Sequence, residues 1–246
     1  MLKSVRALRN RLFLTRRYPK LDGFYSQYGQ DFFLVNEIFN HTTNGFFVDI
    51  GAHDGVTLSN TYYLEKNLSW KGICIEANPD AYERLRRNRN CLCLQAAISA
   101  QRGGNMRFLR IEGYSQMLSG LIDKYDPRHV ERIRKELDLY GGKAEEIMVP
   151  SNNLNELLAK SSVRRVDYLS VDVEGSELDI LQSLDFGQVN YRVIGAENNY
   201  GDDKIEKHMN RHGFKLVAVV GSDEFYVDKK RSPKAREARA YPRLSA

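Results

Sequence analysis

The chain has 246 residues, of which 42% are hydrophobic and 11% aromatic, enough for one α/β domain with a substantial core and unlike the composition of a disordered protein. Residues 1–20 carry a net charge of +7 and residues 229–246 a net charge of +6, so the body between them carries −8 of the total of +5. Because a nucleic-acid-binding domain carries its basic residues on the folded face, we expect no nucleic acid as partner.

The first 24 residues are predicted to form a basic arm. Leu2, Val5, Leu8 and Leu12 recur at helical spacing with arginines between them, a pattern that favours a helix packed on the domain and also fits contact with an anionic membrane surface. The longest apolar run, at residues 12–14, is too short for a signal sequence or a membrane span. We therefore expect a cytoplasmic protein.

The stretch from Phe46 to Gly55 predicts a buried strand that runs into a tight glycine turn. In an open α/β sheet, ligands bind beyond the carboxyl ends of the strands. Asp49 and Asp54 bracket Gly51, and a phosphate cradle would not place two carboxylates against its ligand. The turn suits a neutral or cationic ligand with an amine and hydroxyls, such as S-adenosylmethionine, and it lacks the nicotinamide fingerprint GxGxxG.

Strands and helices then alternate along the chain, which predicts a largely parallel sheet with right-handed crossovers. The final two strands are separated by three residues only, so we expect an antiparallel hairpin at the edge of the sheet. After Phe46–Ile50 the expected elements are a helical stretch containing Ser59–Glu65, a strand Gly72–Glu76, a helix Pro79–Asn88, a strand Cys91–Ala97, a strand Asp167–Val173, a helix containing Leu178–Leu184, a strand Tyr191–Glu197, a helix near Lys204–His212, and strands Phe214–Val220 and Glu224–Val227.

Residues 103–160 interrupt this alternation. They predict a strand Met106–Ile111, a charged helix Asp126–Leu139 and a strand near Glu146–Pro150. We interpret the region as an insertion that covers the pocket and supplies substrate contacts. The whole domain is expected to span residues 25–228, followed by a basic tail, 229–246, whose composition predicts disorder.

Acidic residues follow three of the predicted strands. Glu76 ends a strand 21 residues after Gly55, a position from which a carboxylate accepts hydrogen bonds from ribose hydroxyls. Strand periodicity places Asp172 and Glu174 on one side, and Glu197 ends the neighbouring strand.

These acids could take a proton from a hydroxyl. With Asn198, the carboxylates Asp172 and Glu197 could instead hold magnesium or manganese, or bond backbone amides or an ammonium group. His53, in the turn, is a base, a substrate contact or a bystander.

Several segments together resemble the FkbM family of methyltransferases: Tyr25–Asp31, Asp49–Gly55, Ser59-Asn60-Thr61 with Leu64-Glu65, Trp70–Gly72, Ile75–Pro79 and Asp167–Glu177. The resemblance runs from about Tyr25 to Val227. It implies a Rossmann-like class I methyltransferase fold with a mostly parallel seven-stranded sheet, S-adenosylmethionine as methyl donor, and O-methylation of a sugar hydroxyl or a small natural product.

The resemblance also implies roles for individual residues. The methionine end of the cofactor would be held by the turn, the ribose by Glu76 and the adenine by the segments after the second and third strands, while the acids would face the reaction centre. By position, these are Gln30, Asp49, Gly51, Ala52, Asp54, Gly55, Asn60, Glu76, Ala77, Asn78, Ala96 or Ala97, and Asp172 for the cofactor, and Asp172, Glu174, Glu197 and His53 for catalysis.

Two rival functions stay open at this point. A nicotinamide-dependent oxidoreductase is disfavoured by the acidic turn, and a catalytically silent protein of the same fold would act only as a binding partner. The acceptor of an active enzyme is expected to be a glycan or another small hydroxylated molecule, and Tyr114, Tyr125 and Tyr140 in the insertion are compatible with stacking on a sugar.

Overall fold

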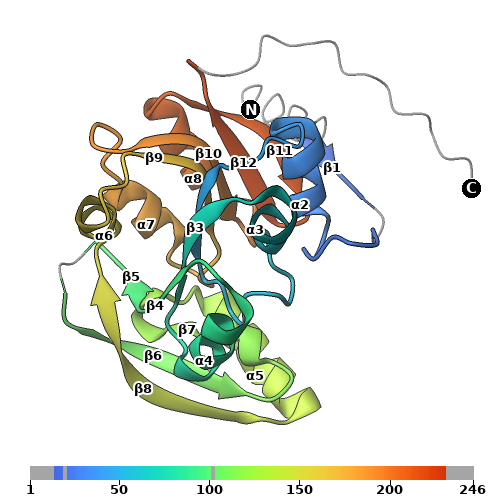
Figure 1. The fold of residues 1–246 in the computed structure, drawn as a ribbon. Helices are drawn as coiled ribbons and strands as arrows, with labels where there is room; N and C mark the ends of the chain where they lie inside the picture. Colours follow the sequence, from blue (N-terminus) through green and yellow to red (C-terminus); the bar gives the residue numbers. More distant parts are fainter. Residues whose placement is uncertain (1–13, 19–20, 101–102, 231–246) are drawn as a thin grey trace, which may run out of the picture.

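The computed structural model describes residues 14–18, 21–100 and 103–230 (Figure 1). Residues 1–13 of the predicted basic arm, and the predicted tail from residue 231 onwards, lie outside the described residues. Within the described part of the chain, no helix combines the length and the apolar character that crossing a membrane requires.

The main sheet has eight strands, all parallel to their neighbours except one. Seven of them form the predicted sheet, and β12 runs antiparallel to both β10 and β11, which confirms the closing hairpin. The two-residue strand β1 pairs with the outer edge of β11, because that edge presents unpaired backbone groups, and so adds an eighth strand to the seven predicted. The order is β1 (Thr15–Arg16), β11 (Phe214–Val220), β12 (Asp223–Asp228), β10 (Asn190–Glu197), β9 (Arg165–Val171), β2 (Phe46–Ile50), β3 (Lys71–Glu76), β4 (Leu92–Gln95) (Figure 1).

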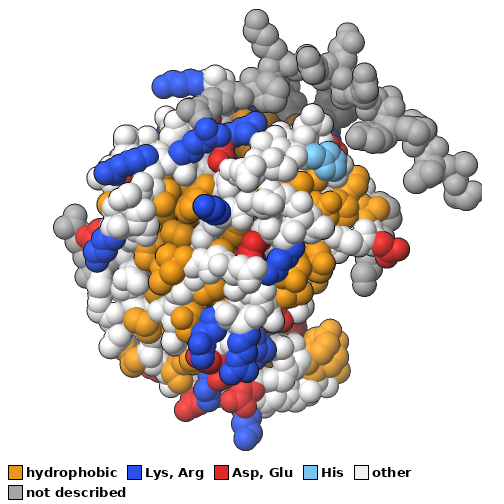
Figure 2. All heavy atoms as spheres, viewed as in Figure 1, with side chains coloured by type: hydrophobic (Ala, Val, Ile, Leu, Met, Phe, Trp, Pro, Cys, Tyr) orange, Lys and Arg blue, Asp and Glu red, His pale blue; other side chains and the backbone are white. Residues whose placement is uncertain are grey.

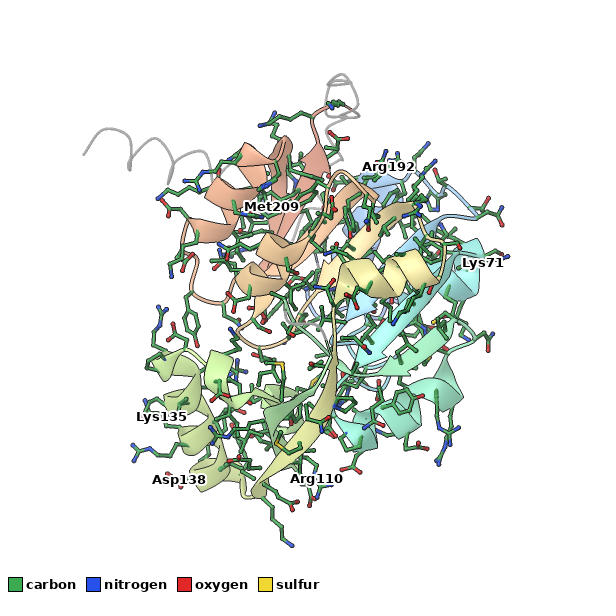
Figure 3. The ribbon with its side chains drawn as sticks, turned by 90° about the vertical axis from the view of Figure 1, so that its left-hand side faces the viewer. Lys71, Arg110, Lys135, Asp138, Arg192 and Met209 are labelled. Carbon is green, nitrogen blue, oxygen red and sulfur yellow. The ribbon has the colours of Figure 1, made fainter. Side chains whose placement is uncertain are left out.

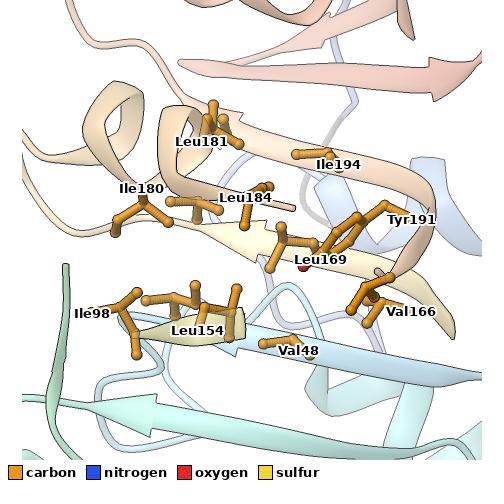
Figure 4. Packing of buried hydrophobic residues seen from close by; sticks show 14 of the residues in the cluster. Val48, Ile98, Leu154, Val166, Leu169, Ile180, Leu181, Leu184, Tyr191 and Ile194 are labelled. Atoms are coloured by element: carbon orange, nitrogen blue, oxygen red, sulfur yellow. The ribbon is translucent and has the colours of Figure 1, made fainter. Parts of the chain in front are cut away.

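Helices cover both faces of this sheet, so its central strands are buried on both sides and read as continuous apolar runs. On one face, side chains such as Val48 and Leu169 pack with Ile194 against α6 (Leu154–Lys160), α7 (Glu177–Ser183) and α8 (Lys204–Arg211) (Figure 4). The next residue of each strand points to the other face, which is covered by α2 (Gln30–Phe33), its π-helical continuation Leu34–Ile38, α3 (Tyr62–Leu68) and α4 (Pro79–Asn88). The helices from Gln30 to Ile38 and at α6 were not predicted.

The insertion, residues 97–100 and 103–152, forms a second sheet of its own beside the main one (Figure 1). Its order is β5 (Ala97–Ile98), β8 (Lys143–Asn152), β6 (Asn105–Glu112), β7 (Gly120–Leu121), and α5 (Pro127–Tyr140) packs on β6 through an apolar cluster. Short 3-10 turns, Gln116–Leu118 and Ile122–Lys124, flank β7.

The third predicted strand, Cys91–Ala97, is in fact divided between the two sheets. It leaves the main sheet after Gln95, and Ala97 and Ile98 pair with Ser151 and Asn152 of β8 instead. The insertion therefore begins earlier than predicted. The helix α6 lies within the range predicted for the insertion but packs in the core of the main sheet.

The outer surface of the insertion carries ion pairs between neighbouring elements. Arg107 bonds Glu146, and Arg110 bonds Glu145 and reaches Asp80 on α4. In Figure 2, basic and acidic side chains accordingly mix at the lower end of the molecule, where α4 and the strands β6 and β8 lie. Exposed pairs of this kind contribute little to stability, so the apolar contacts of β6 with β7, β8 and α5 carry the fold of the insertion.

The helices α4 and α5 begin at the same sequence signal, a capping residue followed by proline. The Asn78 side chain accepts a hydrogen bond from the Asp80 amide at 3.0 Å, and the Asp126 side chain accepts one from the Arg128 amide at 2.8 Å. Proline at the next position suits the first helical residue because its missing N–H has no partner there. The predicted bounds of α4 are confirmed for this reason.

Arg89, directly after α4, supports the glycine turn from behind. Its side chain is fully buried and forms an ion pair with Glu65 of α3. The same guanidinium donates to the Gly55 carbonyl and to the Thr61 hydroxyl, both at 3.0 Å. Because Thr61 in turn donates to Asp49, the turn, α3 and the end of α4 form one polar network.

We predict that Arg89→Met destabilises the protein by roughly 3–5 kcal/mol, because it removes the buried partner of Glu65 Oε2 and leaves Glu65 with only Lys66 and the Asn90 amide, both at Oε1. Urea unfolding followed by circular dichroism measures the loss. The double variant Arg89→Met/Glu65→Gln should recover part of it. Arg86→Met, which breaks an exposed pair with Glu83 on the same helix, is the matched control and should leave the midpoint nearly unchanged. Equal effects of Arg86→Met and Arg89→Met would contradict the assignment.

Candidate active site at the carboxyl ends of the strands

A cavity of about 230 Å³ lies at the carboxyl ends of β2, β3, β9 and β10, between the main sheet and the insertion. The turn after β2 forms one wall. Gly51 adopts a φ of 85°, and a Cβ atom there would lie 1.6 Å from the Asp172 carbonyl oxygen. A glycine is therefore required where the turn passes the end of β9.

Asp49 and His53 of the turn line the cavity, whereas Asp54 and Gly55 do not. Burial raises the pKa of Asp49, against the influence of Arg89 and of the Thr61 hydroxyl. The Asp54 carboxylate instead accepts the amides of Val56 and Thr57 and the Thr57 hydroxyl. Partial burial opposes the ionised form, but the His53 and Thr57 side chains, followed by the two amides, hold the pKa of Asp54 below its ordinary value.

The predicted cofactor roles of Asp54 and Gly55 are thus replaced by structural ones. Asp54 caps the turn. A Cβ on Gly55 would come within 2.7 Å of Arg89 and Leu85, so this glycine allows α4 to pack closely.

Glu76 lies at the end of β3 with 8% of its surface exposed and lines the cavity. One carboxylate oxygen accepts the His53 amide at 2.8 Å and the other accepts the Asn78 amide at 2.7 Å. Burial raises its pKa, and the two backbone bonds work against that rise. These bonds fix the carboxylate at the cavity wall and leave it further lone pairs for hydroxyl groups.

Most of the other residues predicted to hold a cofactor also line the cavity. Ala96 and Ala97 lie in its floor, where the chain passes from one sheet to the other, and Ala77 and Asn78 follow Glu76. Asn60 donates to Asp223 at 3.2 Å and to Ser170 at 3.4 Å, and the side-chain Oε1 of Gln30 accepts the Tyr28 amide at 2.7 Å.

The three predicted acids Asp172, Glu174 and Glu197 do converge on the cavity. The periodicity argument for the first two was wrong, because β9 ends at Val171. Glu174 reaches the cavity from a left-handed backbone conformation with a φ of 60°. Burial and the neighbouring carboxylates raise the pKa of Glu174 to about 7 and that of Glu197 to about 9, and they raise that of Asp172 as well.

The predicted metal set is only partly assembled. Asp172, Glu177 and Glu197 offer oxygen atoms that lie within 4.8 Å of one another. Asn198, which was predicted to join them, does not line the cavity, and its amide nitrogen donates to the Asp202 carbonyl and to Glu224. The structure thus gives Asn198 a role in holding the loop after Glu197.

Sequence reasoning missed Asp223, which lines the cavity at the start of β12 and whose pKa burial raises to about 6. The signal was topological. Since β11 runs parallel to β10, the predicted hairpin turn between β11 and β12 had to lie at the same edge of the sheet as Glu197.

The insertion closes the cavity from the other side and contributes Phe108, Leu121, Arg132 and the segment Gln116–Ser119. Among the described residues that line the cavity, Arg132 is the only Lys or Arg. His129, one turn earlier on α5, is 2% exposed, and its Nδ1 lies 3.4 Å from Glu174 Oε2. Sequence reasoning gave no role to His129.

The aromatic residues of the insertion divide into two groups. Tyr125 stacks on the ring of His129, with 4.8 Å between the ring centroids. Tyr114 and Tyr140 contact each other on the outer surface and are not part of the cavity wall.

Glu174 Oε2 and His53 Nδ1 face charged or titratable neighbours, His129 Nδ1 at 3.4 Å and Asp54 Oδ1 at 3.7 Å. Nε2 of His53 and Oδ1 of Asn60 are buried polar atoms of the cavity that have no hydrogen-bond partner among the described residues. Buried polar groups are normally paired, so these atoms mark positions where a ligand would bond. Together with the carboxylates of Asp49 and Glu76 and the apolar floor, they fit a ligand with an ammonium group, a ribose and a flat ring, as S-adenosylmethionine has.

Comparison with known proteins identifies the family of the chain. The methyltransferase FkbM domain matches residues 49–216. Methyltransferase sdnD of Sordaria araneosa is 28% identical over 167 residues, a match that spans 61% of this chain and 64% of that relative.

Among solved structures, a precorrin-6y C5,15-methyltransferase from Geobacter metallireducens has a TM-score of 0.42 at 10% identity and covers 85% of this chain and 92% of its own. A TehB-like S-adenosylmethionine-dependent methyltransferase from Corynebacterium glutamicum has a TM-score of 0.40 at 13% identity, with coverages of 92% and 94%.

The strand order of the main sheet, with β12 antiparallel beside β10, confirms the predicted Rossmann-like class I methyltransferase fold. The FkbM match covers more than half of the chain and includes the glycine turn, Glu76, Asp172 and Glu197. The chain therefore belongs to the FkbM methyltransferase family.

Proposed function

We propose that the protein is an S-adenosylmethionine-dependent O-methyltransferase that acts on a hydroxyl of a sugar or of another small hydroxylated molecule. The observation that carries the proposal is Glu174, a buried carboxyl in the cavity whose pKa is raised to about 7. A hydroxyl is a poor nucleophile until its proton leaves, and a general base works best when its pKa lies near the working pH.

The cavity separates a cofactor end from an acceptor end. Asp49, Gly51 and Ala52 would hold the methionine part, Glu76 the ribose, and the floor at Ala96 and Ala97 the adenine. When bound, S-adenosylmethionine supplies an already activated methyl group. What the chain itself must do is align the acceptor hydroxyl and accept its proton, and alignment of bound reactants can correspond to effective molarities above ~10⁵ M.

Binding of the cofactor can be tested directly. S-adenosylhomocysteine at about 100 times its dissociation constant should stabilise the protein by about 2.7 kcal/mol, which corresponds to a rise in melting temperature of roughly 5–10 °C. NAD should give no shift, and Glu76→Gln should weaken the shift with S-adenosylhomocysteine. Differential scanning fluorimetry measures all three. No shift with either nucleotide would favour a catalytically silent protein, and a shift with NAD alone an oxidoreductase.

Glu174 is the best candidate for the base among the acids of the cavity. At neutral pH Glu197, with its pKa at about 9, holds a proton, and its two oxygens already accept hydrogen bonds from Asn199 at 2.7 Å and Ser222 at 3.3 Å. The pKa of Asp172 is raised by burial and by both neighbouring glutamates, so Asp172 also favours the protonated form. Glu174 Oε2 faces His129 Nδ1 at 3.4 Å and accepts no hydrogen bond from the backbone amides of its own loop.

We predict that Glu174→Gln lowers kcat by ~10²- to 10⁴-fold, the usual contribution of a general base. The base acts in its ionised form and its pKa is raised, so kcat/KM of the unmodified protein should rise with pH through about 7. Transfer of a labelled methyl group to a panel of glycans and small hydroxylated metabolites provides the assay. Glu83→Gln, an exposed glutamate on α4, is the control. Unchanged turnover of Glu174→Gln would exclude Glu174 as the base.

The lining of the cavity supports an uncharged, hydroxyl-rich acceptor. Carboxylates and amides predominate around Glu174, and Arg132 is the only cationic Lys or Arg side chain among the described lining residues. A phosphorylated acceptor would normally be held by several basic groups or by helix N-termini. A glycan hydroxyl is the first choice on this ground, and a hydroxyl of a small natural product is the alternative.

The cluster of Asp172, Glu177 and Glu197 could hold a divalent cation or share protons, and the hydrogen bonds favour protons. Glu177 Oε1 already accepts the amides of Val173 and Gly175, and Glu197 is bonded through both oxygens. Shared protons relieve the repulsion among such close carboxylates without a metal.

We therefore predict that protein treated with a chelator keeps its full methyltransferase activity and gains none from added Mg²⁺ or Mn²⁺. The same labelled-methyl assay, before and after dialysis against EDTA, measures this. Loss of activity that Mg²⁺ or Mn²⁺ restores would instead assign a cation to Asp172, Glu177 and Glu197.

A further inference from the structure

His129 is buried on the inner side of α5 and is held there by three contacts. Its Nε2 lies 3.2 Å from the Leu118 carbonyl oxygen, its ring stacks on Tyr125, and its Nδ1 lies 3.4 Å from Glu174 Oε2. The Leu118 carbonyl also accepts the hydroxyl of Tyr125 at 2.9 Å. Since a carbonyl oxygen only accepts, Nε2 must carry a proton, and the neutral ring therefore presents the bare Nδ1 to Glu174.

The loop that carries Glu174 is also held in place by several contacts. The backbone of Glu174 is left-handed, and the loop around it is held by Glu177, which accepts the amides of Val173 and Gly175. A Cβ on Gly175 would lie 2.9 Å from the Lys124 carbonyl oxygen, so this loop lies directly against the insertion. Lys124 also forms an ion pair with Asp179 of α7 at 2.5 Å.

We propose that His129 is a positioning residue for Glu174. With Nε2 bonded to Leu118, the ring directs Nδ1 at one carboxyl oxygen of Glu174 and leaves the other oxygen for the hydroxyl of the acceptor. The inference rests on the proposed role of Glu174 as base. It makes the insertion part of the catalytic centre, because the residue that orients the base comes from α5.

The contact between Nδ1 and Oε2 requires one proton. A bare Nδ1 facing a carboxylate would be repulsive, so the pair exists either as a neutral ring that accepts from a carboxylic acid or as an imidazolium that donates to a carboxylate. No proton is lost or gained when the pair passes from one form to the other. In the second form, the free oxygen of Glu174 can take the proton of the acceptor hydroxyl.

Several charged or titratable groups surround this pair and influence the shared proton. Burial lowers the pKa of His129 and so disfavours the imidazolium, while the bond to the Leu118 carbonyl works against that change. Arg132 on α5 also disfavours the imidazolium and favours ionised Glu174, whereas Glu136 and Asp126 of the same helical segment favour the imidazolium. The remaining groups around the pair are Tyr125 and Tyr200 from the two flanking loops, Asp172 and Glu177 from the segment after β9, and Glu197 from β10.

Nitrogen NMR of protein labelled with ¹⁵N-histidine tests the pair without any acceptor. The chain has five histidines, and the signals of His129 are those lost in His129→Asn. We expect the neutral ring to carry its proton on Nε2. We further expect the titration of Nδ1 to move to lower pH in Glu174→Gln, because the carboxylate that stabilises the imidazolium is gone. A proton on Nδ1 in the neutral ring, or identical titrations in the two proteins, would overturn the proposal.

Two isosteric variants then separate the contact with Glu174 from the contact with Leu118. The amide of asparagine occupies the place of Nδ1 and that of glutamine the place of Nε2. We expect His129→Gln to lower kcat by ~10-fold or more and His129→Asn to keep most of it, with the KM for S-adenosylmethionine unchanged in both. The reverse order, with the glutamine variant active, would show that only the bond to Leu118 matters.

The pH profile gives a readout that a merely structural role would not change. The amide N–H of His129→Asn can donate to the ionised carboxylate, so the acidic limb of kcat/KM should move to lower pH in this variant. If the acidic limb of kcat/KM lies at the same pH in His129→Asn and in the unmodified protein, the proposal is contradicted. Lys135→Ala, on the outward face of α5 (Figure 3), is the matched control and should behave as the unmodified protein.

The outcomes also distinguish the two proposals. If Glu174→Gln keeps full turnover, Glu174 is not the base and the proposed mechanism fails together with the role of His129. If Glu174→Gln is inactive while His129→Gln is fully active, the role of Glu174 as base is retained and only the positioning role of His129 is excluded. Binding of S-adenosylhomocysteine, measured by the thermal shift, should be the same in the two His129 variants and in the unmodified protein.

Discussion

Burial of several carboxyl groups in one cavity is the constraint on which the rest of the site depends. Asp49, Asp172, Glu174, Glu197 and Asp223 all line it. Burial disfavours the charged form of each acid, and for most of them the charges of neighbouring carboxylates add a repulsion in the same direction. The pKa values are accordingly raised, that of Asp223 to about 6, that of Glu174 to about 7 and that of Glu197 to about 9.

Two arginines oppose these effects from opposite sides. Arg89 lies behind the glycine turn and favours the ionised form of Asp49, while Arg132 lies on the insertion and favours that of Glu174. The first is buried and bonded to backbone and side chains of the turn, so it acts mainly through the fold. The second is half exposed, and its guanidinium pairs with Glu136. An arginine beside the main sheet therefore acts on the charge of Asp49, and an arginine of the insertion adjusts that of Glu174.

The strands of the main sheet could be predicted from the sequence because both of their faces are buried, which makes each a continuous apolar run with a sharp end. The glycine turn and Glu76 followed from the same logic, since both stand where a parallel strand ends. Residues whose role depends on one neighbouring hydrogen bond could not be placed in this way. Asp54 turned out to cap its own turn, and Asn198 bonds Asp202 and Glu224.

Contacts between distant segments were the other limit. Nothing in the spacing of α5 indicates that His129 meets Glu174, which lies 45 positions further along the chain, because that contact depends on how the insertion folds back. The division of the third predicted strand had the same cause. An apolar run from Cys91 to Ala97 does not reveal that its last residues pair with β8, more than 50 positions away.

That division has a consequence for how such a protein can change. The residues where the chain leaves the main sheet, Ala97 and Ile98, pair directly with Ser151 and Asn152, where it returns. The two ends of the insertion are thus joined by backbone hydrogen bonds at its root. A change in the length of the segment between them therefore leaves the path from β4 to α6 in place. The main sheet can in this way carry insertions of different length, each attached at the same two-residue joint.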